Sequence, residues 1–264
     1  MNLTTLDRVK YLADIKGATQ DSLIKQLISA VSSQIERSNL FDRYIEQKAR
    51  TEYFDTEYDQ KIISVKGVPI VSITSLDFDT ARVWGSGSAV DASLYGINNA
   101  RGQLKFDQYV FSRGFGALKL VYTGGLAIST DRFIASVVVG GSGSFTASEI
   151  VTGGTSNARG TFVSLAGDVI TIDVIAGIFE AGEVVTGLTS TKSRTLLAIT
   201  QTPLVMAYPD LALACEIQVK YIKDRKDNLG LRSVSQEGGS ISTYQTGQLL
   251  PEVKDIIKAY KIYR

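Results

Sequence analysis

The sequence predicts an α+β protein: a small helical bundle packed with an antiparallel β-sheet, plus an inserted all-β domain. Three observations predict this class. Helical periodicity is confined to the two ends of the chain, strand-favouring residues fill the part between them, and a segment within that part repeats itself. A length of 264 residues with 44% apolar residues suffices for one large domain or two modest ones.

Two helices are expected within residues 4–40. The second carries an apolar stripe with a spacing of four residues, joined by Ile24 and Ile28: Leu23, Leu27, Val31 and Ile35. Such a stripe is typical of an amphipathic helix that buries one face. From about residue 50 to 123, short strand-favouring segments are separated by Gly and Asp/Asn turns, which predicts an antiparallel sheet.

Helix is expected again after Tyr208 and from Pro251, because proline suits the first position of a helix. Residues 228–248 between these two helices are rich in Gly, Ser and Gln, which predicts a loop.

Residues 129–203 differ from the sequence on either side and contain an internal repeat. At an offset of 34 residues, 143–161 matches 177–195 at ten of nineteen positions. Each copy includes a glutamate, Glu149 or Glu183, followed by a Val-Thr-Gly turn. One such β unit hides too little surface alone, so the two copies are expected to stack into a small all-β domain.

The predicted domain organisation follows from this repeat. Residues 1–128 and 205–264 form one core of helices and antiparallel sheet that ends in a C-terminal segment. Residues 129–204 form an inserted Gly/Thr/Val-rich β-repeat domain.

The composition excludes several classes of function. The chain has no histidine, which removes Ser-His and Cys-His catalysis and His-ligated zinc. The single cysteine, Cys215, lies on an apolar stripe and is expected in the core. With 28 basic and 27 acidic residues the net charge is +1, so tight binding of DNA is not expected. No apolar run approaches the roughly 20 residues that span a bilayer, so no membrane anchor is expected. The amino terminus, Met1–Asp7, lacks the basic and then apolar pattern of a signal peptide, so none is expected.

Acidic residues provide the candidates for catalysis or metal binding. Two groups stand out: Glu52, Asp55, Glu57 and Asp59, and then Asp77 with Asp79. Either group could hold Ca²⁺ or act as a glycosidase-like carboxylate pair, but a solvated edge is favoured because neither has EF-hand spacing. Glu149 and Glu183 precede the same turn in both copies, which favours a structural role over acid–base catalysis. No catalytic residue, metal or cofactor is predicted.

One aromatic residue is a candidate for contact with a partner. Trp84 lies in a glycine-rich loop, Trp84-Gly85-Ser86-Gly87-Ser88. Its side chain could be exposed for binding, or it could fold back over its own hairpin.

Six short sequences follow one another along the chain: Leu6–Leu12, Asp21–Ile24, Gly67–Leu76, Asp91–Ile97, Gly102–Phe106 and Leu120–Gly125. Pro209-Asp210-Leu211, Leu250–Val253 and the closing Tyr260–Arg264 come after them. In this order they resemble the head-tail connector (adaptor) proteins of tailed bacteriophages, over residues 1 to about 128 and 205–264. Residues 129–203 depart from that family, in which the strand passes almost directly into the helix.

The resemblance implies a structural, non-enzymatic protein of the virion, assembled in the bacterial host cytoplasm and located at the head–tail interface. It would form a ring, twelve-fold to match the portal, beneath the portal protein. The ring would bind a stopper or tail completion protein and extend the channel through which double-stranded DNA passes without specific binding. By the same analogy the closing segment docks on the portal, through Leu250, Val253, Ile256, Ile257, Tyr260, Tyr263 and Arg264.

Two other classes of function stay open. One is a virion-associated cell-wall hydrolase that uses a carboxylate pair. The other is a carbohydrate- or receptor-binding module in which the inserted β domain makes the contact.

Overall fold

The computed structural model describes residues 1–58, 60–107, 111–138, 144–225, 233–236, 239–242 and 248–261. Contacts divide the chain into two compact units. The first comprises Met1–Leu40 and Ser129–Tyr260, and the second comprises Phe41–Ile128 with Lys261. Helices, antiparallel sheets and a closed barrel are all present, so the predicted α+β class with an all-β part is confirmed.

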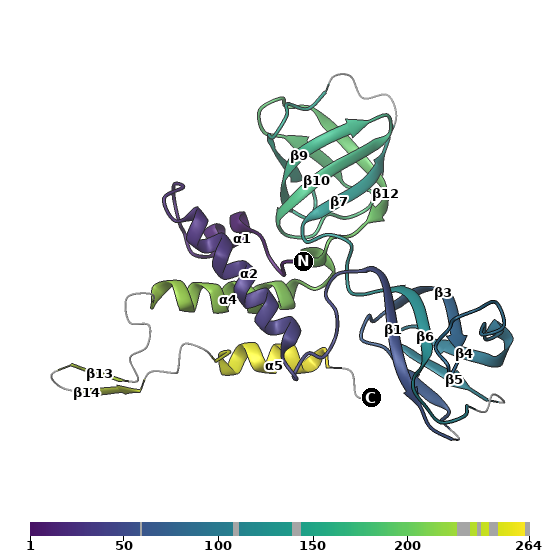
Figure 1. Ribbon diagram of the computed structural model, residues 1–264. Helices are drawn as coiled ribbons and strands as arrows, with labels where there is room; N and C mark the ends of the chain where they lie inside the picture. The colour runs from purple at the N-terminus through teal and green to yellow at the C-terminus, as the bar shows by residue number, and fades with distance from the viewer. Residues whose placement is uncertain are drawn as a thin grey trace. The chain divides into compact units, whose positions relative to one another are not determined.

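The first unit contains a helical bundle drawn from both ends of the chain (Figure 1). Its helices are α1 (Leu6–Leu12), α2 (Asp21–Arg37), α3 (Leu204–Ala207), α4 (Pro209–Asp224) and α5 (Pro251–Ala259). Helix α4 contacts each of the other four and is therefore the central helix. The buried stripe of α2 is centred on Ile24, Ile28, Val31 and Ile35, with Leu23 and Leu27 at its margin.

A short two-stranded sheet lies between α4 and α5 in the chain. Strand β13 (Ser233–Gln236) pairs antiparallel with β14 (Gly239–Ser242), with Val234 opposite Ile241. The sequence predicts a loop over 228–248, so these strands are a difference from expectation.

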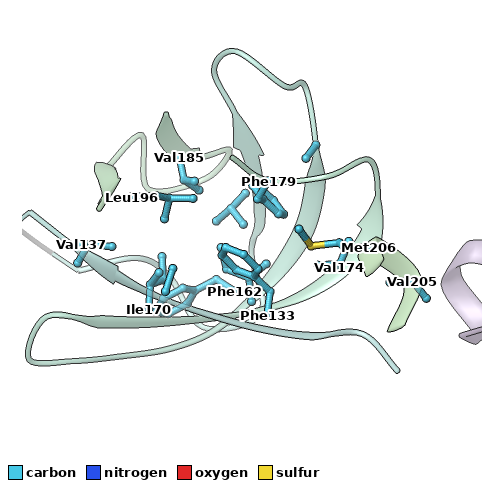
Figure 2. Packing of buried hydrophobic residues seen from close by; sticks show 14 of the residues in the cluster. Phe133, Val137, Phe162, Ile170, Val174, Phe179, Val185, Leu196, Val205 and Met206 are labelled. Atoms are coloured by element: carbon cyan, nitrogen blue, oxygen red, sulfur yellow. The ribbon is translucent and has the colours of Figure 1, made fainter. Parts of the chain in front are cut away.

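The rest of the first unit is a closed six-stranded barrel. Its strands are β7 (Arg132–Val137), β8 (Ile150–Gly153), β9 (Arg159–Ala166), β10 (Val169–Ala176), β11 (Val184–Gly187) and β12 (Ser193–Gln201). They follow one another around the barrel in the order β10-β7-β12-β11-β8-β9, and every pairing is antiparallel. Phe133, Phe162 and Phe179 point into the barrel (Figure 2) and are at most 6% exposed.

The two sequence copies form equivalent parts of this barrel. Strands β8 and β9 of the first copy correspond to β11 and β12 of the second, at the offset of 34 residues. Thr152 on β8 pairs directly with its own equivalent, Thr186 on β11. The barrel is therefore built around a local two-fold axis that passes between β8 and β11.

The core of the barrel continues onto the helices. Val205 and Met206 of α3 and Ala212 of α4 belong to the same buried cluster as the barrel side chains. The Arg8 guanidinium on α1 also donates a hydrogen bond to the Ile175 carbonyl on β10, at 3.4 Å. These contacts group the helices with the barrel, whereas the sequence predicts the helices together with the sheet. That residues 129–204 fold as a separate domain stays a prediction.

The second unit contains two three-stranded antiparallel sheets. The first has the order β1 (Lys48–Thr56), β6 (Gly114–Gly124), β3 (Ile70–Phe78). The second has the order β2 (Ile62–Ser64), β5 (Gln103–Phe106), β4 (Tyr95–Asn98), with the 3-10 helix η1 (Ala92–Leu94) directly before β4. Leu104 and Phe106 of the second sheet share one buried cluster with Leu120 and Tyr122 of the first.

Candidate functional site

The repeated glutamates lie in the barrel, where each carboxylate is enclosed by backbone N–H groups. Glu149 is 5% exposed. Its Oε1 accepts hydrogen bonds from the Thr146 N–H at 2.7 Å and the Ser190 hydroxyl at 2.6 Å. Its Oε2 accepts from the backbone N–H groups of Thr189 at 2.9 Å and Ser190 at 2.8 Å. Glu149 of the first copy therefore holds the turn of the second copy.

Glu183 of the second copy makes the equivalent contacts with the turn of the first copy. It accepts from the Glu180 N–H at 2.7 Å and from the N–H of Thr155 at 3.4 Å. The Ser156 N–H donates to Glu183 Oε2 at 3.1 Å, and the Ser156 hydroxyl lies 2.8 Å from the same oxygen. Each copy thus supplies a carboxylate to the turn of the other copy. We call this pair of contacts the carboxylate exchange.

The sequence predicts a turn at each Val-Thr-Gly, but the structure places these residues in β8 and β11, and the turn follows them. The glycine that ends each strand makes room for the incoming carboxylate. A Cβ atom on Gly187 would lie 2.6 Å from Glu149 Oε1 and 2.6 Å from Ser190 Oγ. A Cβ atom on Gly153 would lie 2.4 Å from Glu183 Oε2. All three distances are far inside van der Waals contact, so a larger residue at either position would displace the bound carboxylate.

The environment of Glu149 stabilises its charged form. Burial raises the pKa of this carboxyl, but the hydrogen bonds from the Ser190 hydroxyl and from the Ser190, Thr146 and Thr189 N–H groups outweigh it, and the pKa is lowered from 4.5. A general acid needs a raised pKa. The carboxylate exchange is therefore a structural contact between the two copies, and the lowered pKa of Glu149 does not favour a general acid at that position.

The loop that contains Trp84 is organised by Asp79. The Asp79 carboxylate accepts hydrogen bonds from the backbone N–H groups of Ala81 at 2.8 Å, Val83 at 2.8 Å and Trp84 at 3.1 Å. These bonds, from Ala81 first and then Val83, lower the pKa of Asp79. The loop needs this support because Trp84 has a φ of 55°, a conformation that residues other than glycine rarely adopt.

The Trp84 side chain rests on the first sheet of its unit. Its ring centroid lies 5.8 Å from that of Tyr53 on β1, and the Lys119 ammonium on β6 lies 5.7 Å from the ring. Of the two arrangements open at the sequence level, the indole folds back over its own sheet, while its side chain stays partly exposed.

The acidic candidates of the second unit that the structure describes each have a local partner. Glu52 accepts a hydrogen bond from the Tyr122 hydroxyl at 2.5 Å, and Asp55 accepts from the Gly116 N–H at 2.7 Å. Glu57 lies 3.5 Å from Arg113, and Asp77 accepts from the Ser75 hydroxyl at 3.1 Å. Asp59 lies outside the described residues. In the part of the chain that the structure describes, no group of three or more acidic or cysteine side chains is arranged to hold a metal ion.

The C-terminal helix α5 packs on its own chain. Val253 and Ile257 are 0% exposed in the bundle, where α5 lies against α4. Leu250 donates its backbone N–H to Gln218 Oε1 at 2.9 Å, and the Tyr260 hydroxyl donates to the Asp210 carboxylate.

Two of the predicted portal-docking residues, Val253 and Ile257, are therefore core residues of the monomer. Leu250, Ile256 and Tyr260 stay partly exposed. Leu250 also lines a shallow apolar pocket with Leu12, Ile217 and Tyr221. The remaining candidates, Tyr263 and Arg264, lie outside the described residues.

A buried ion pair was missed at the sequence level. Glu216 on α4 is 3% exposed and accepts hydrogen bonds from the Arg8 guanidinium at 2.7 Å and the Thr4 hydroxyl at 2.6 Å. The signal is present in the sequence, because Glu216 lies between Ala212 and Val219 on the buried face of α4. A charged side chain on such a face needs a partner from another element.

Comparison with known proteins identifies no relative: no family model matches the chain, and no curated protein matches it. No described helix is long and apolar enough to cross a membrane.

Proposed function

We propose that this chain is a structural protein of a tailed-phage virion, and that copies of it form a ring that joins the head to the tail beneath the portal. In this proposal the chain is made in the bacterial cytoplasm and has no catalytic step. Its partners are the portal protein and a stopper or tail completion protein, and double-stranded DNA passes through the ring. The support is the ordered resemblance to head-tail connectors together with the places that the resembling sequences occupy in the fold.

The resembling sequences of the second unit pack directly on one another. Gly67 donates its N–H to the Tyr122 hydroxyl at 2.9 Å, and a Cβ atom on Gly67 would lie 2.6 Å from that oxygen. A Cβ atom on Gly124 would lie 2.2 Å from the Gly67 carbonyl oxygen, and one on Gly102 would lie 2.2 Å from Val68 Cγ2. Gly67–Leu76, Gly102–Phe106 and Leu120–Gly125 thus depend on each other for their close packing.

The resembling sequences at the two ends of the chain also meet. Arg8, in the first sequence, pairs with Glu216, in the helix that begins at Pro209. Asp210 of that helix accepts the hydrogen bond from Tyr260, in the closing sequence. The observation that carries the proposal is that sequences far apart in the chain, in the order typical of connectors, form the packing contacts of both units.

The proposal is tested by mixing the purified protein with portal rings of the same phage and imaging the mixture by negative-stain electron microscopy. We expect a ring of this protein stacked on one end of the portal. A protein that neither forms rings nor binds the portal would overturn the proposal. So would turnover of cell-wall glycan that is lost in Asp77→Asn while the fold is kept, because it would assign the chain to the hydrolases.

A further inference from the structure

Strand β1 presents a long sheet edge with which no described strand of its own unit pairs. It is nine residues long and lies at the end of the sheet order β1-β6-β3. Within the described residues, every backbone pairing of β1 is with β6. Figure 1 shows β6 alongside β1 within the second unit.

The opposite edge of the same sheet is covered. The Phe78 N–H on β3 donates to the Ser88 carbonyl at 2.7 Å, and the Val90 N–H donates to the Leu76 carbonyl at 2.8 Å. Residues 88–90 therefore run alongside β3 as a partial extra strand. The barrel is closed and has no edges, and the edge strands β2 and β4 have three and four residues. Among the described sheets, β1 is thus the longest uncovered edge.

An uncovered edge of this length is a template for pairing with another strand. Its outward N–H and C=O groups are ready to hydrogen bond, and natural proteins usually blunt such an edge with charged side chains, proline, a bulge or a covering segment. Strand β1 carries charged side chains at Lys48, Arg50, Glu52 and Asp55. It contains no proline, and its one irregularity in register falls at its far end, between Phe54 and Thr56. The edge from Lys48 to Phe54 is regular and available for strand addition.

The hairpin β13–β14 is a sheet of two strands and has no third strand among the described ones. Its two strands pair with each other, and neither makes a substantial contact with another described helix or strand. A lone two-stranded sheet is at best marginally stable in water, and a third strand is the usual remedy.

We propose that the β13–β14 hairpin of one copy adds to the β1 edge of the next copy, which gives a continuous five-stranded sheet across the subunit boundary. The proposal rests on the proposed function, because it names the contact by which the ring closes. Strand addition of this kind takes its affinity from main-chain hydrogen bonds.

A second copy fits the two surfaces better than other occupants do. The hairpin and the β1 edge are different surfaces of one chain, so a contact between them is head-to-tail. Such contacts generate a closed ring when the rotation between copies closes. In a closed ring every hairpin has a strand to join and every β1 edge is covered. Among the pairings of the described strands, neither the hairpin nor the β1 edge has a further strand beside it.

The test uses the full chain with two paired variants. Val234→Pro with Ile241→Pro removes two backbone donors from the hairpin and is incompatible with regular strand pairing. The control, Val234→Thr with Ile241→Thr, changes the same positions but keeps β-branched residues that favour strands. Both variants should keep the wild-type melting temperature, since the hairpin makes no substantial contact with another described helix or strand.

Two measurements are made over a range of protein concentrations, alone and with portal rings. Mass photometry gives the oligomeric state, and hydrogen–deuterium exchange gives the protection of peptides from β1 and, as an internal reference, from β4. In the wild type and the threonine control, assembly should protect β1 and leave β4 unchanged. The proline variant should need at least about tenfold more protein to assemble, which corresponds to the loss of one to two main-chain hydrogen bonds, and its β1 should stay unprotected.

Three results would overturn the inference. The first is assembly of the proline variant at wild-type concentrations, and the second is a wild-type ring in which β1 exchanges freely. Either would leave the proposed function intact. The third is protection of β1 that does not depend on concentration, because the hairpin would then be pairing within its own chain. If the wild type forms no ring, alone or on the portal, the proposed function fails as well.

Discussion

The carboxylate exchange provides the sharpest test of how the barrel is stabilised. We consider the substitution Glu149→Gln, which keeps the size of the side chain and replaces one carboxylate oxygen by an NH₂ group. In the native barrel each oxygen of Glu149 accepts two hydrogen bonds. Whichever way the amide points, its NH₂ group faces two donors that have lost their acceptor.

The magnitude follows from those two donors. Each buried donor without an acceptor costs about 1–3 kcal/mol, so Glu149→Gln should lower the free energy of unfolding by about 2–6 kcal/mol. Glu183→Gln should have a similar effect, since its contacts with Glu180, Thr155 and Ser156 are equivalent. The loss should be confined to the cooperative unit that includes the barrel.

The assay has to separate the barrel from the second unit. Trp84 is the only tryptophan and lies in the second unit, so its fluorescence reports on that unit. Hydrogen exchange of peptides from β8 to β12, measured in increasing urea, reports on the barrel. Asp173→Asn is the matched control: this exposed carboxylate on the same barrel pairs with Arg132, and its loss should cost less than about 1 kcal/mol. The reasoning is refuted if Glu149→Gln costs no more than the control, or if it shifts the tryptophan transition instead.

Four further outcomes are expected. Gly187→Ala should destabilise the barrel by about 1–3 kcal/mol in the same exchange assay, because the new methyl group overlaps the bound carboxylate; an unchanged barrel would contradict this. Because the pKa of Glu149 is lowered, the stability that its carboxylate gives the barrel is fully present above about pH 4.5 and is lost as the pH falls through the folded-state pKa. The destabilising effect of Glu149→Gln should therefore shrink in urea titrations at progressively lower pH. Glu216→Ala should cost about 3–5 kcal/mol by circular dichroism melting, because it removes the buried carboxylate that pairs with the partly buried Arg8 guanidinium; a loss typical of a surface ion pair would argue against the burial of this pair. Ile257→Ala should cost about 2–5 kcal/mol and Ile256→Ala clearly less, since Ile257 is fully buried and Ile256 is not; equal losses would show that α5 is placed otherwise.

Elements whose signal lies in local periodicity could be predicted from the sequence. The four-residue spacing in α2 and the proline at the start of α4 and α5 each correspond to a helix in the structure. The repeat likewise predicted a β domain made of two equivalent copies. Its closure into a six-stranded barrel could not be derived, because closure depends on which strands pair across the two copies, as Thr152 does with Thr186.

Long-range polar contacts were beyond sequence reasoning. The repeat indicated that Glu149 and Glu183 have structural roles, yet nothing local shows that each carboxylate binds the turn of the other copy about 40 or 27 residues away. The C-terminal segment illustrates the same limit. An apolar stripe at Val253 and Ile257 shows that α5 covers something, but only the fold shows that the partner is α4 of the same chain.

The two ends of the barrel segment lie side by side. Leu204 donates its N–H to the Ser129 carbonyl at 2.9 Å, and Val205 donates to the Thr130 carbonyl at 3.0 Å. A segment whose two ends are held side by side can be gained or exchanged in evolution without altering the path of its host. Exchange of the barrel segment is nevertheless constrained where it meets the helices, because Val205, Met206 and Ala212 complete the barrel core. An engineered replacement would have to present an apolar surface there, or carry polar substitutions at these three positions, to keep the helices soluble.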